Sequence, residues 1–191
     1  RVEPGDYVAS GDELARVLQR RHSGEPPPEL ATRGAGAFDL GPTRTMQQDV
    51  GFGLRQLVDI ALKAISPAVN DPSTATLCID RLGSLLAEQA PRRPGARALL
   101  EGQEVLVWAP QPSFADLVDL AFNQLRQYGK ADLAVSIRIA HALARAGRAC
   151  RLEEQRQRLL HHAELLRAAL VDSFQREDRA RFDAALAELE V

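Results

Sequence analysis

The sequence predicts a mainly α-helical fold with a small β component (α+β), and three observations support this prediction. After residue 43, apolar residues recur at three- and four-residue spacing, which is typical of amphipathic helices. One helical hexapeptide pattern occurs twice, 60 residues apart. Stretches near the N-terminus and near 103–109 show the alternation and the turn residues of β-strands. We therefore expect two related helical hairpins at 44–90 and 113–147, followed by amphipathic helices within 151–190.

The N-terminal segment, residues 1–22, has the pattern of a small β unit. Its opening RVEPGDYVASGDELARV alternates apolar and polar residues around two glycine turns. The spacing of the segment resembles half of the barrel-sandwich fold of biotinyl and lipoyl carrier domains. The modifiable lysine of those domains has no counterpart here, because the lysines of the chain are Lys63 and Lys130. We interpret the segment as a structural half-unit, which a Gly- and Pro-rich linker at 23–42 joins to a helical domain at 43–191. The residues whose spacing resembles the second half of the barrel-sandwich fold of such carriers are Val2, Gly5, Asp6, Val8, Gly11 and Leu14.

Composition and charge exclude several classes of protein. The net charge is -2, and no block of Lys or Arg is long enough to follow a phosphate backbone, so we expect no nucleic-acid partner. Cys78 and Cys150 fit neither a zinc site nor a disulfide framework, and no cofactor motif occurs. No apolar run reaches the roughly 20 residues that span a bilayer. We expect a soluble chain in a reducing compartment and, since it begins without Met in the middle of a pattern, a part of a longer protein.

The stretch SPAVNDPST at 66–74 interrupts the longest helical pattern. Before it, the apolar spacing predicts one helix of about six turns that starts after Thr43 as its N-cap. Pro67 cannot continue a helix, whereas Asp71 has the residue type of an N-cap and Pro72 suits the first helical position. The stretch therefore predicts the end of one helix before Pro67 and the start of another at Asp71 or Pro72.

Two interpretations of this corner are open. In the first, it is a rigid turn between antiparallel helices, in which capping accounts for every residue except Asn70. In the second, the free N–H groups at the start of the second helix, together with Asn70, Ser73 and Thr74, bind an anion or a substrate carboxylate. Asp71 argues against the second interpretation, because a carboxylate cap competes for the same donors.

The repeated pattern places an aspartate in each of two apolar contexts. Residues 57–62 read LVDIAL and residues 117–122 read LVDLAF, with Asp59 and Asp119 at the same position. A carboxylate there is costly unless it is paired, so we expect an arginine, a backbone cap or the other aspartate as its partner. If the two carboxylates meet, one pKa rises sharply. If they lie at the edges of the apolar faces, each forms an ordinary surface pair with a basic residue one turn away.

Two further segments complete the prediction. The run EVLVWA within 103–109 predicts a strand that pairs with the N-terminal β unit or with a partner chain.

In the C-terminal segment, His161 and His162 are adjacent, so they point about 100 degrees apart on a helix and share no metal-binding face. The spacing of His161 and Glu164 is a weak signal by itself. We expect ordinary surface or boundary histidines and no metal site.

The run RTMQQDVGFGLRQLVDIALKAISPAVNDPSTATLCIDRL, which starts at Arg44, and the run AFNQLRQYG, which starts at Ala121, resemble a bacterial family. This family is domain of unknown function 2254, whose members are described as predicted membrane proteins. The resemblance implies several transmembrane helices at the N-terminus of the full-length protein, with this chain as a C-terminal region outside the membrane, and it implies no activity. The residues that match the centre of the family pattern are Arg44, Thr45, Gln48, Asp49, Phe52, Gly53, Gln56, Asp59, Ser66, Pro67, Asn70, Asp71, Pro72 and Thr74. Those that we interpret as structural are Arg44, Asp49, Gly53, Gln56, Pro67 and Pro72.

Two hypotheses about function remain. The first is a non-enzymatic regulatory, ligand-sensing or assembly module on the cytoplasmic side of the cell membrane. Its partners would be the membrane-embedded part of the same full-length chain and, in a homo-oligomer, further copies. The second is a metal- or anion-binding, hydrolase-like site around the corner, with the ligands Asp59, Asn70, Asp71, Ser73, Thr74 and Asp119. We favour the first, because about 22 helical residues place Arg44 and Ser66 roughly 30 Å apart, which prevents one site from containing all polar motif residues.

Overall fold

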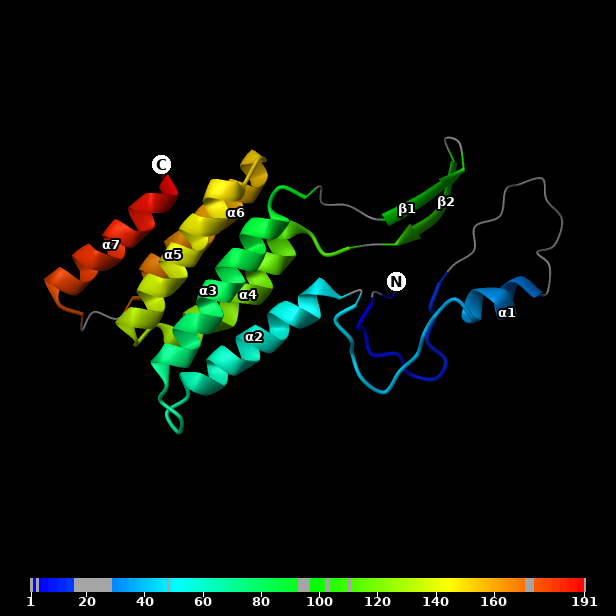
Figure 1. Ribbon diagram of the computed structural model, residues 1–191, viewed down its shortest axis with the longest axis horizontal. Helices are drawn as coiled ribbons and strands as arrows, with labels where there is room; N and C mark the ends of the chain where they lie inside the picture. The colour runs from blue at the N-terminus through cyan, green and yellow to red at the C-terminus, as the bar shows by residue number, and fades with distance from the viewer. Residues whose placement is uncertain are drawn as a thin grey trace. The chain divides into compact units, whose positions relative to one another are not determined.

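The computed structural model describes the chain in two compact units, 1–52 and 53–191, which we treat separately. The described residues are 2, 4–15, 29–47, 49–92, 97–101, 104–109, 111–170 and 174–190. The predicted helical class is confirmed: six helices make up most of the described part of the second unit (Figure 1). They are α2 (Val50–Ala64), α3 (Pro72–Gln89), α4 (Phe114–Gly129), α5 (Leu133–Ala149), α6 (Glu153–Ala169) and α7 (Arg176–Glu190).

The six helices form three successive hairpins, α2–α3, α4–α5 and α6–α7, which lie side by side. α5 packs between α3 and α7, and α4 packs against α6 (Figure 1). α2 joins α4 through a hydrogen bond from Arg55 Nη1 to Gln124 Oε1 of 2.7 Å. The first helices of the hairpins, α2, α4 and α6, therefore form one layer, and the second helices, α3, α5 and α7, form the other.

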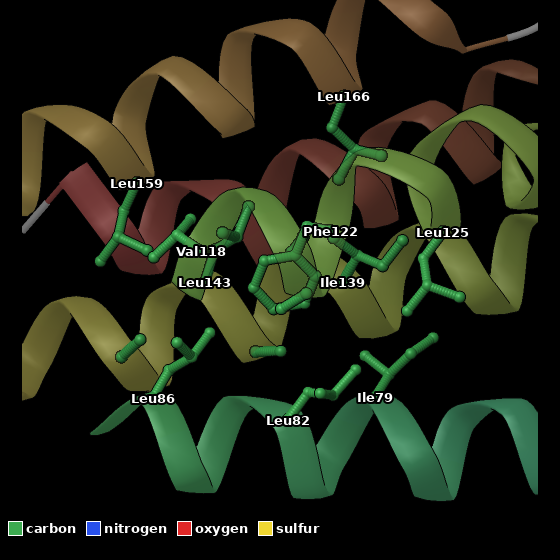
Figure 2. Packing of buried hydrophobic residues seen from close by; sticks show 14 of the residues in the cluster. Ile79, Leu82, Leu86, Val118, Phe122, Leu125, Ile139, Leu143, Leu159 and Leu166 are labelled. Atoms are coloured by element: carbon green, nitrogen blue, oxygen red, sulfur yellow. The ribbon is translucent and has the colours of Figure 1, made fainter. Parts of the chain in front are cut away.

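The core of the second unit lies between these two layers, and its buried positions recur from hairpin to hairpin. Figure 2 shows side chains of α3, α4, α5 and α6 meeting in this core. Buried positions of α3 recur in α5 after 60 residues and in α7 after a further 43. The equivalent buried residues are Ile79, Ile139 and Phe182; Leu82, Ala142 and Ala185; and Leu86, Ala146 and Leu189. This recurrence supports the inferred relation between the first two hairpins and extends the same burial pattern to the third.

The start of α2 differs from the prediction. The helix begins at Val50 rather than after Thr43, because Asp49 acts as the cap and accepts a hydrogen bond from the Phe52 N–H at 2.8 Å. Arg44 holds the Asp49 carboxylate in place from the preceding segment, with Nε 3.0 Å from Oδ2. The predicted separation of about 30 Å between Arg44 and Ser66 assumed one continuous helix and therefore does not hold.

The other predicted helix starts are confirmed. α3 begins at Pro72 after Asp71 as its N-cap. Ser113 caps α4 in a reciprocal pair with Asp116, whose carboxylate accepts a hydrogen bond from the Ser113 N–H at 2.8 Å. These caps satisfy backbone donors that a helix start otherwise leaves without partners.

In its described residues, the first unit contains turns and a short helix. The predicted strands of the N-terminal segment do not occur in its described residues, 2 and 4–15; Gly5 and Gly11 adopt positive φ angles of 92° and 97° in turns. A strand needs a paired neighbour to be stable, and Gly5 instead lies against the side chains of Arg44 and Asp49. The predicted linker contains the helix α1 (Glu29–Ala35), while its proline run lies outside the described residues, as does Gln48.

A β-hairpin precedes α4. β1 (Arg97–Glu101) pairs antiparallel with β2 (Glu104–Ala109), with a shift in register between Leu99 and Leu100. The predicted strand near 103–109 is therefore confirmed. Its partner is the preceding strand of the same chain, so the expected pairing with the N-terminal β unit or with a partner chain is wrong.

Candidate functional site

The corner between α2 and α3 is closed by its own backbone. The Asp71 N–H donates a hydrogen bond of 2.8 Å to the carbonyl of Ala64, and the Asn70 N–H donates one of 2.9 Å to the carbonyl of Ser66. Asn70 is the residue that makes this closure possible, because it adopts a left-handed conformation with φ of 48°. Asn tolerates this region better than most other non-glycine residues. The corner interpretation thus also accounts for Asn70, which capping alone does not explain.

Both carboxylate oxygens of Asp71 are used within the corner. Oδ1 accepts the Thr74 N–H at 3.0 Å, and Oδ2 accepts the Thr74 hydroxyl at 2.5 Å. The hydrogen bond from the Thr74 hydroxyl, followed by the bond from its backbone, lowers the pKa of Asp71. The side chains of Asn70 and Ser73 are exposed. An anion at this helix start would have to compete with a fixed negative charge, so the geometry favours a structural cap over an anion site.

Asp59 forms the surface pair that a helical aspartate commonly makes. Its Oδ1 lies 2.6 Å from Nη2 of Arg55, one turn earlier in α2, and 54% of the side chain is exposed. The second guanidinium nitrogen of Arg55 carries the hydrogen bond to Gln124 of α4. The predicted arginine partner is present, and the carboxylate orients that arginine across to the next hairpin.

Asp119 occupies the equivalent position in α4, but its partners come from α6. Its Oδ1 accepts hydrogen bonds of 2.8 Å from Arg158 Nε and from His162 Nε2, and its Oδ2 binds a second guanidinium nitrogen of Arg158. Burial alone would raise the pKa of Asp119, but the hydrogen bonds and the charges of Arg158 and His162 outweigh it and lower the pKa. Asp119 is therefore an ionised carboxylate that attaches the third hairpin to the second.

His162 is the most deeply buried member of this cluster, with only 1% of its side chain exposed. Because Nε2 faces an ionised carboxylate, it carries the ring proton in the neutral tautomer. Nδ1 is then an acceptor, and it is buried without a hydrogen-bond partner. Burial lowers the pKa of His162, and its hydrogen bond to Asp119 only partly opposes this effect. The expectation of a surface or boundary histidine is therefore wrong for His162, whereas His161 is half exposed.

The predicted site residues do not form one cluster. Ile65, which precedes the corner, lies beside Gly129 at the C-terminal end of α4. Asp119 is ten residues before Gly129, which corresponds to about 15 Å along the helix. Asp59 and Asp119 each pair with an arginine rather than with each other. Within the described ranges, no three His, Cys, Asp or Glu side chains are grouped as metal ligands.

The motif residues of the first unit support each other structurally. The guanidinium group of Arg44 lies 5.0 Å from the ring centroid of Phe52 and pairs with Asp49, which caps α2. A Cβ atom at Gly5 would lie 2.1 Å from Asp49 Oδ2, so only glycine fits against this pair.

Gly53, Gln56 and Pro67 make no contact that indicates a ligand, and Gln56 and Pro67 are exposed.

Sequence reasoning missed Arg158 and His162 as partners of Asp119. Both lie in α6, whose apolar pattern is weak, so its buried face could not be read from periodicity. The available signal was the spacing of the two residues, which places them one turn apart on the same face of a helix.

Comparison with known proteins decides the family. The family model described as "Predicted membrane protein (DUF2254)" matches residues 1–145. The chain belongs to this family. The match includes the first unit, the corner and Asp119, whereas Arg158 and His162 lie beyond it.

Curated relatives of this family member come from mycobacteria. An uncharacterized protein of Mycobacterium bovis and two of Mycobacterium tuberculosis are each 36% identical to it over 148 residues, or 76% of the chain. The chain covers 28% of the length of each of them. No solved structure matches the chain. Among the described residues, no helix combines the length and the apolar composition that crossing a membrane requires.

Proposed function

We propose that this region is a non-enzymatic regulatory or assembly module of a membrane protein. It lies outside the membrane on the cytoplasmic side and docks onto the membrane-embedded part of its own full-length chain. The family description supports the membrane context. Both described cysteines, Cys78 and Cys150, are free thiols, which is typical of a reducing compartment.

The observation that carries this proposal is the distribution of polar and apolar groups at the corner. The charged side chain of Asp71 is satisfied internally by Thr74. The apolar residues Pro67, Ala68 and Val69 are exposed, with Val69 at 49%. Tyr128, near the same end of α4, is exposed as well. We call Pro67, Ala68, Val69 and Tyr128 the apolar tip; such a surface is suited to contact with another protein surface rather than to catalysis.

The alternative, a metal- or anion-binding hydrolase-like site, lacks support in the same residues. Asp71, Asp59 and Asp119 each hold a partner from within the chain. A metal ion or a substrate would have to break these pairs before it could bind, and the first and last of the three lie far apart along the hairpins.

Hydrogen exchange on the full-length protein in its membrane tests the proposal. We expect backbone amides at 66–71 and at the end of α4 to exchange at least tenfold more slowly in the full-length protein than in the isolated 191-residue chain. Docking would cover the apolar tip and suppress local opening there. Exchange in α7 serves as the internal control and should be unchanged. Equal exchange at the corner in both proteins would contradict the proposal.

A further inference from the structure

The third hairpin differs from the first two at two buried positions of its first helix. Val58, Val118 and Leu159 are equivalent and buried in α2, α4 and α6. Three residues further along, the buried residue is an alanine in the first two hairpins and a histidine in the third: Ala61, Ala121 and His162. Four residues before Val58, Val118 and Leu159, the buried residues are Leu54, Phe114 and Gln155. The third hairpin thus buries an imidazole at the position where the first two hairpins bury an alanine.

Gln155 satisfies its polar atoms in this position, whereas His162 does so only in part. Gln155 Nε2 donates a hydrogen bond of 3.0 Å to the carbonyl of Ala90, just after α3. His162 Nε2 binds Asp119 at 2.8 Å, but Nδ1 has no partner. The two residues attach the third hairpin to the other two, and only the contact of His162 depends on a proton.

The charges that face His162 come from two helices. α4 contributes the carboxylate of Asp119, which favours the charged ring, and the guanidinium of Arg126, which disfavours it. α6 itself contributes Arg158, which also disfavours the charged ring, and His161, whose ring centroid lies 6.3 Å away. α5 and α7 contribute none of the charges that shift the pKa of His162. On its remaining side the ring meets the edge of Phe122, with 6.4 Å between ring centroids.

Protonation therefore acts against the attachment of α6 to α4. A second ring proton must sit on Nδ1, which is buried and has no acceptor, and an unsatisfied buried donor is costly. The added positive charge also lies near two arginines and only one carboxylate. When α6 separates from α4, the ring enters water and takes up its proton at an ordinary pKa of about 6.5.

We propose that His162 is a pH-sensitive latch that holds the α6–α7 hairpin on the first two hairpins and releases it as the pH falls below about 6.5. The pKa of His162 is lowered in the attached state, so the attached state binds the ring proton less readily than the released state does. A fall in pH therefore favours release. The stabilising effect is thus complete above the released-state pKa and is lost as the pH falls below it. The hairpin is suited to such release because α6 and α7 pack against α4, α5 and each other, so this hairpin can open locally while the first two hairpins stay packed.

Hydrogen exchange of the 191-residue chain between pH 5 and 8, corrected for intrinsic exchange rates, measures this release. Below pH 6.5 we expect the opening equilibrium constant of α6 and α7 to rise by up to about tenfold per pH unit, while that of α3 stays constant. A flat profile in α6 and α7, or an equal rise in α3, would overturn the proposal.

Two variants assign the effect to the latch. His162→Gln keeps a donor for Asp119 but does not titrate, so its profile should be flat between pH 5 and 8. His161→Gln changes the exposed neighbour and should keep the pH dependence of the unmodified chain. If His162→Gln does not fold, NMR titration of the ring of His162 in the unmodified chain replaces it. The ring should then protonate below the ordinary value of about 6.5 in the attached state, and a ring that protonates at or above that value without release would overturn the latch.

Discussion

Asp119→Ala is expected to lower the free energy of unfolding by about 2–4 kcal/mol at pH 7.5, which is a large part of the stability of a domain of this size. The substitution removes a carboxylate that accepts hydrogen bonds from Arg158 and from His162. Arg158 keeps its charge and loses its partner, and His162 becomes a buried ring with no hydrogen bond at either nitrogen. Urea unfolding followed by far-UV circular dichroism measures the difference.

Asp59→Ala is the matched control, because Asp59 holds the equivalent position in the first hairpin. Its side chain is 54% exposed and pairs with an arginine on the same helix, so we expect a loss of less than about 1 kcal/mol. Equal losses for the two substitutions would show that the contact between α4 and α6 contributes no more than a surface ion pair, which contradicts the assignment of Asp119 as the attachment point.

The pH dependence of this effect has a definite sign. The pKa of Asp119 is lowered in the folded chain, so its contribution to stability is present above the ordinary carboxyl value of about 3.8 and is lost as the pH falls through the folded-state value. The difference between the unmodified chain and Asp119→Ala should therefore shrink in acid. His162 acts in a separate window, near pH 6.5, so the two groups can be distinguished in one pH series.

Gly83→Ala is expected to lower the free energy of unfolding by about 1–3 kcal/mol, although alanine is the better helix former by about 1 kcal/mol. A Cβ atom at this position of α3 would lie 2.8 Å from Ala142 Cβ and 2.9 Å from Ala142 Cα in α5. The atoms that it meets belong to a helix backbone and to a side chain without rotatable bonds, so α3 and α5 would have to separate. Thermal and urea unfolding both measure this loss.

Gly34→Ala is the control for this substitution. Gly34 lies in α1, and a Cβ atom there would meet no heavy atom within 4 Å. The same chemical change should therefore be neutral or slightly stabilising. If Gly83→Ala were neutral as well, the close approach of α3 and α5 would be wrong, and with it the packing of the hairpins side by side.

Much of the fold could be predicted because strong local signals coincide with the observed elements. The Asp71–Pro72 pair identified the start of α3, since each of these residue types performs one local function at a helix start, and α4 begins next to Ser113, where the second hairpin was expected. The start of α2 was misplaced because the apolar spacing continues through 44–49, although this segment is held by the pair of Arg44 and Asp49. Such a contact is tertiary, and periodicity does not reveal it.

The third hairpin shows most clearly which part of the fold could not be predicted from the apolar pattern of the sequence. Its buried positions match those of the other hairpins in space, yet Gln155 and His162 replace apolar residues there. The polar Gln155 and His162 weaken the apolar periodicity of α6. The sequence therefore did not reveal that the third hairpin has the same burial pattern as the first two. For the candidate site, the sequence correctly required a partner for Asp119, but the identity of that partner depended on how α6 packs against α4. Ligand binding at the corner residues stays a prediction.

The central claim, that this region works by contact with the rest of its protein, is tested most directly by a binding measurement. The purified 191-residue chain is titrated against the membrane-embedded remainder of the same protein, reconstituted in lipid nanodiscs. We predict saturable binding that Val69→Glu weakens at least tenfold, because a carboxylate would have to be desolvated at the apolar tip. Leu152→Glu, at a similarly exposed apolar residue before α6, should bind like the unmodified chain. Absence of saturable binding, or equal binding by Val69→Glu and the unmodified chain, would contradict the account.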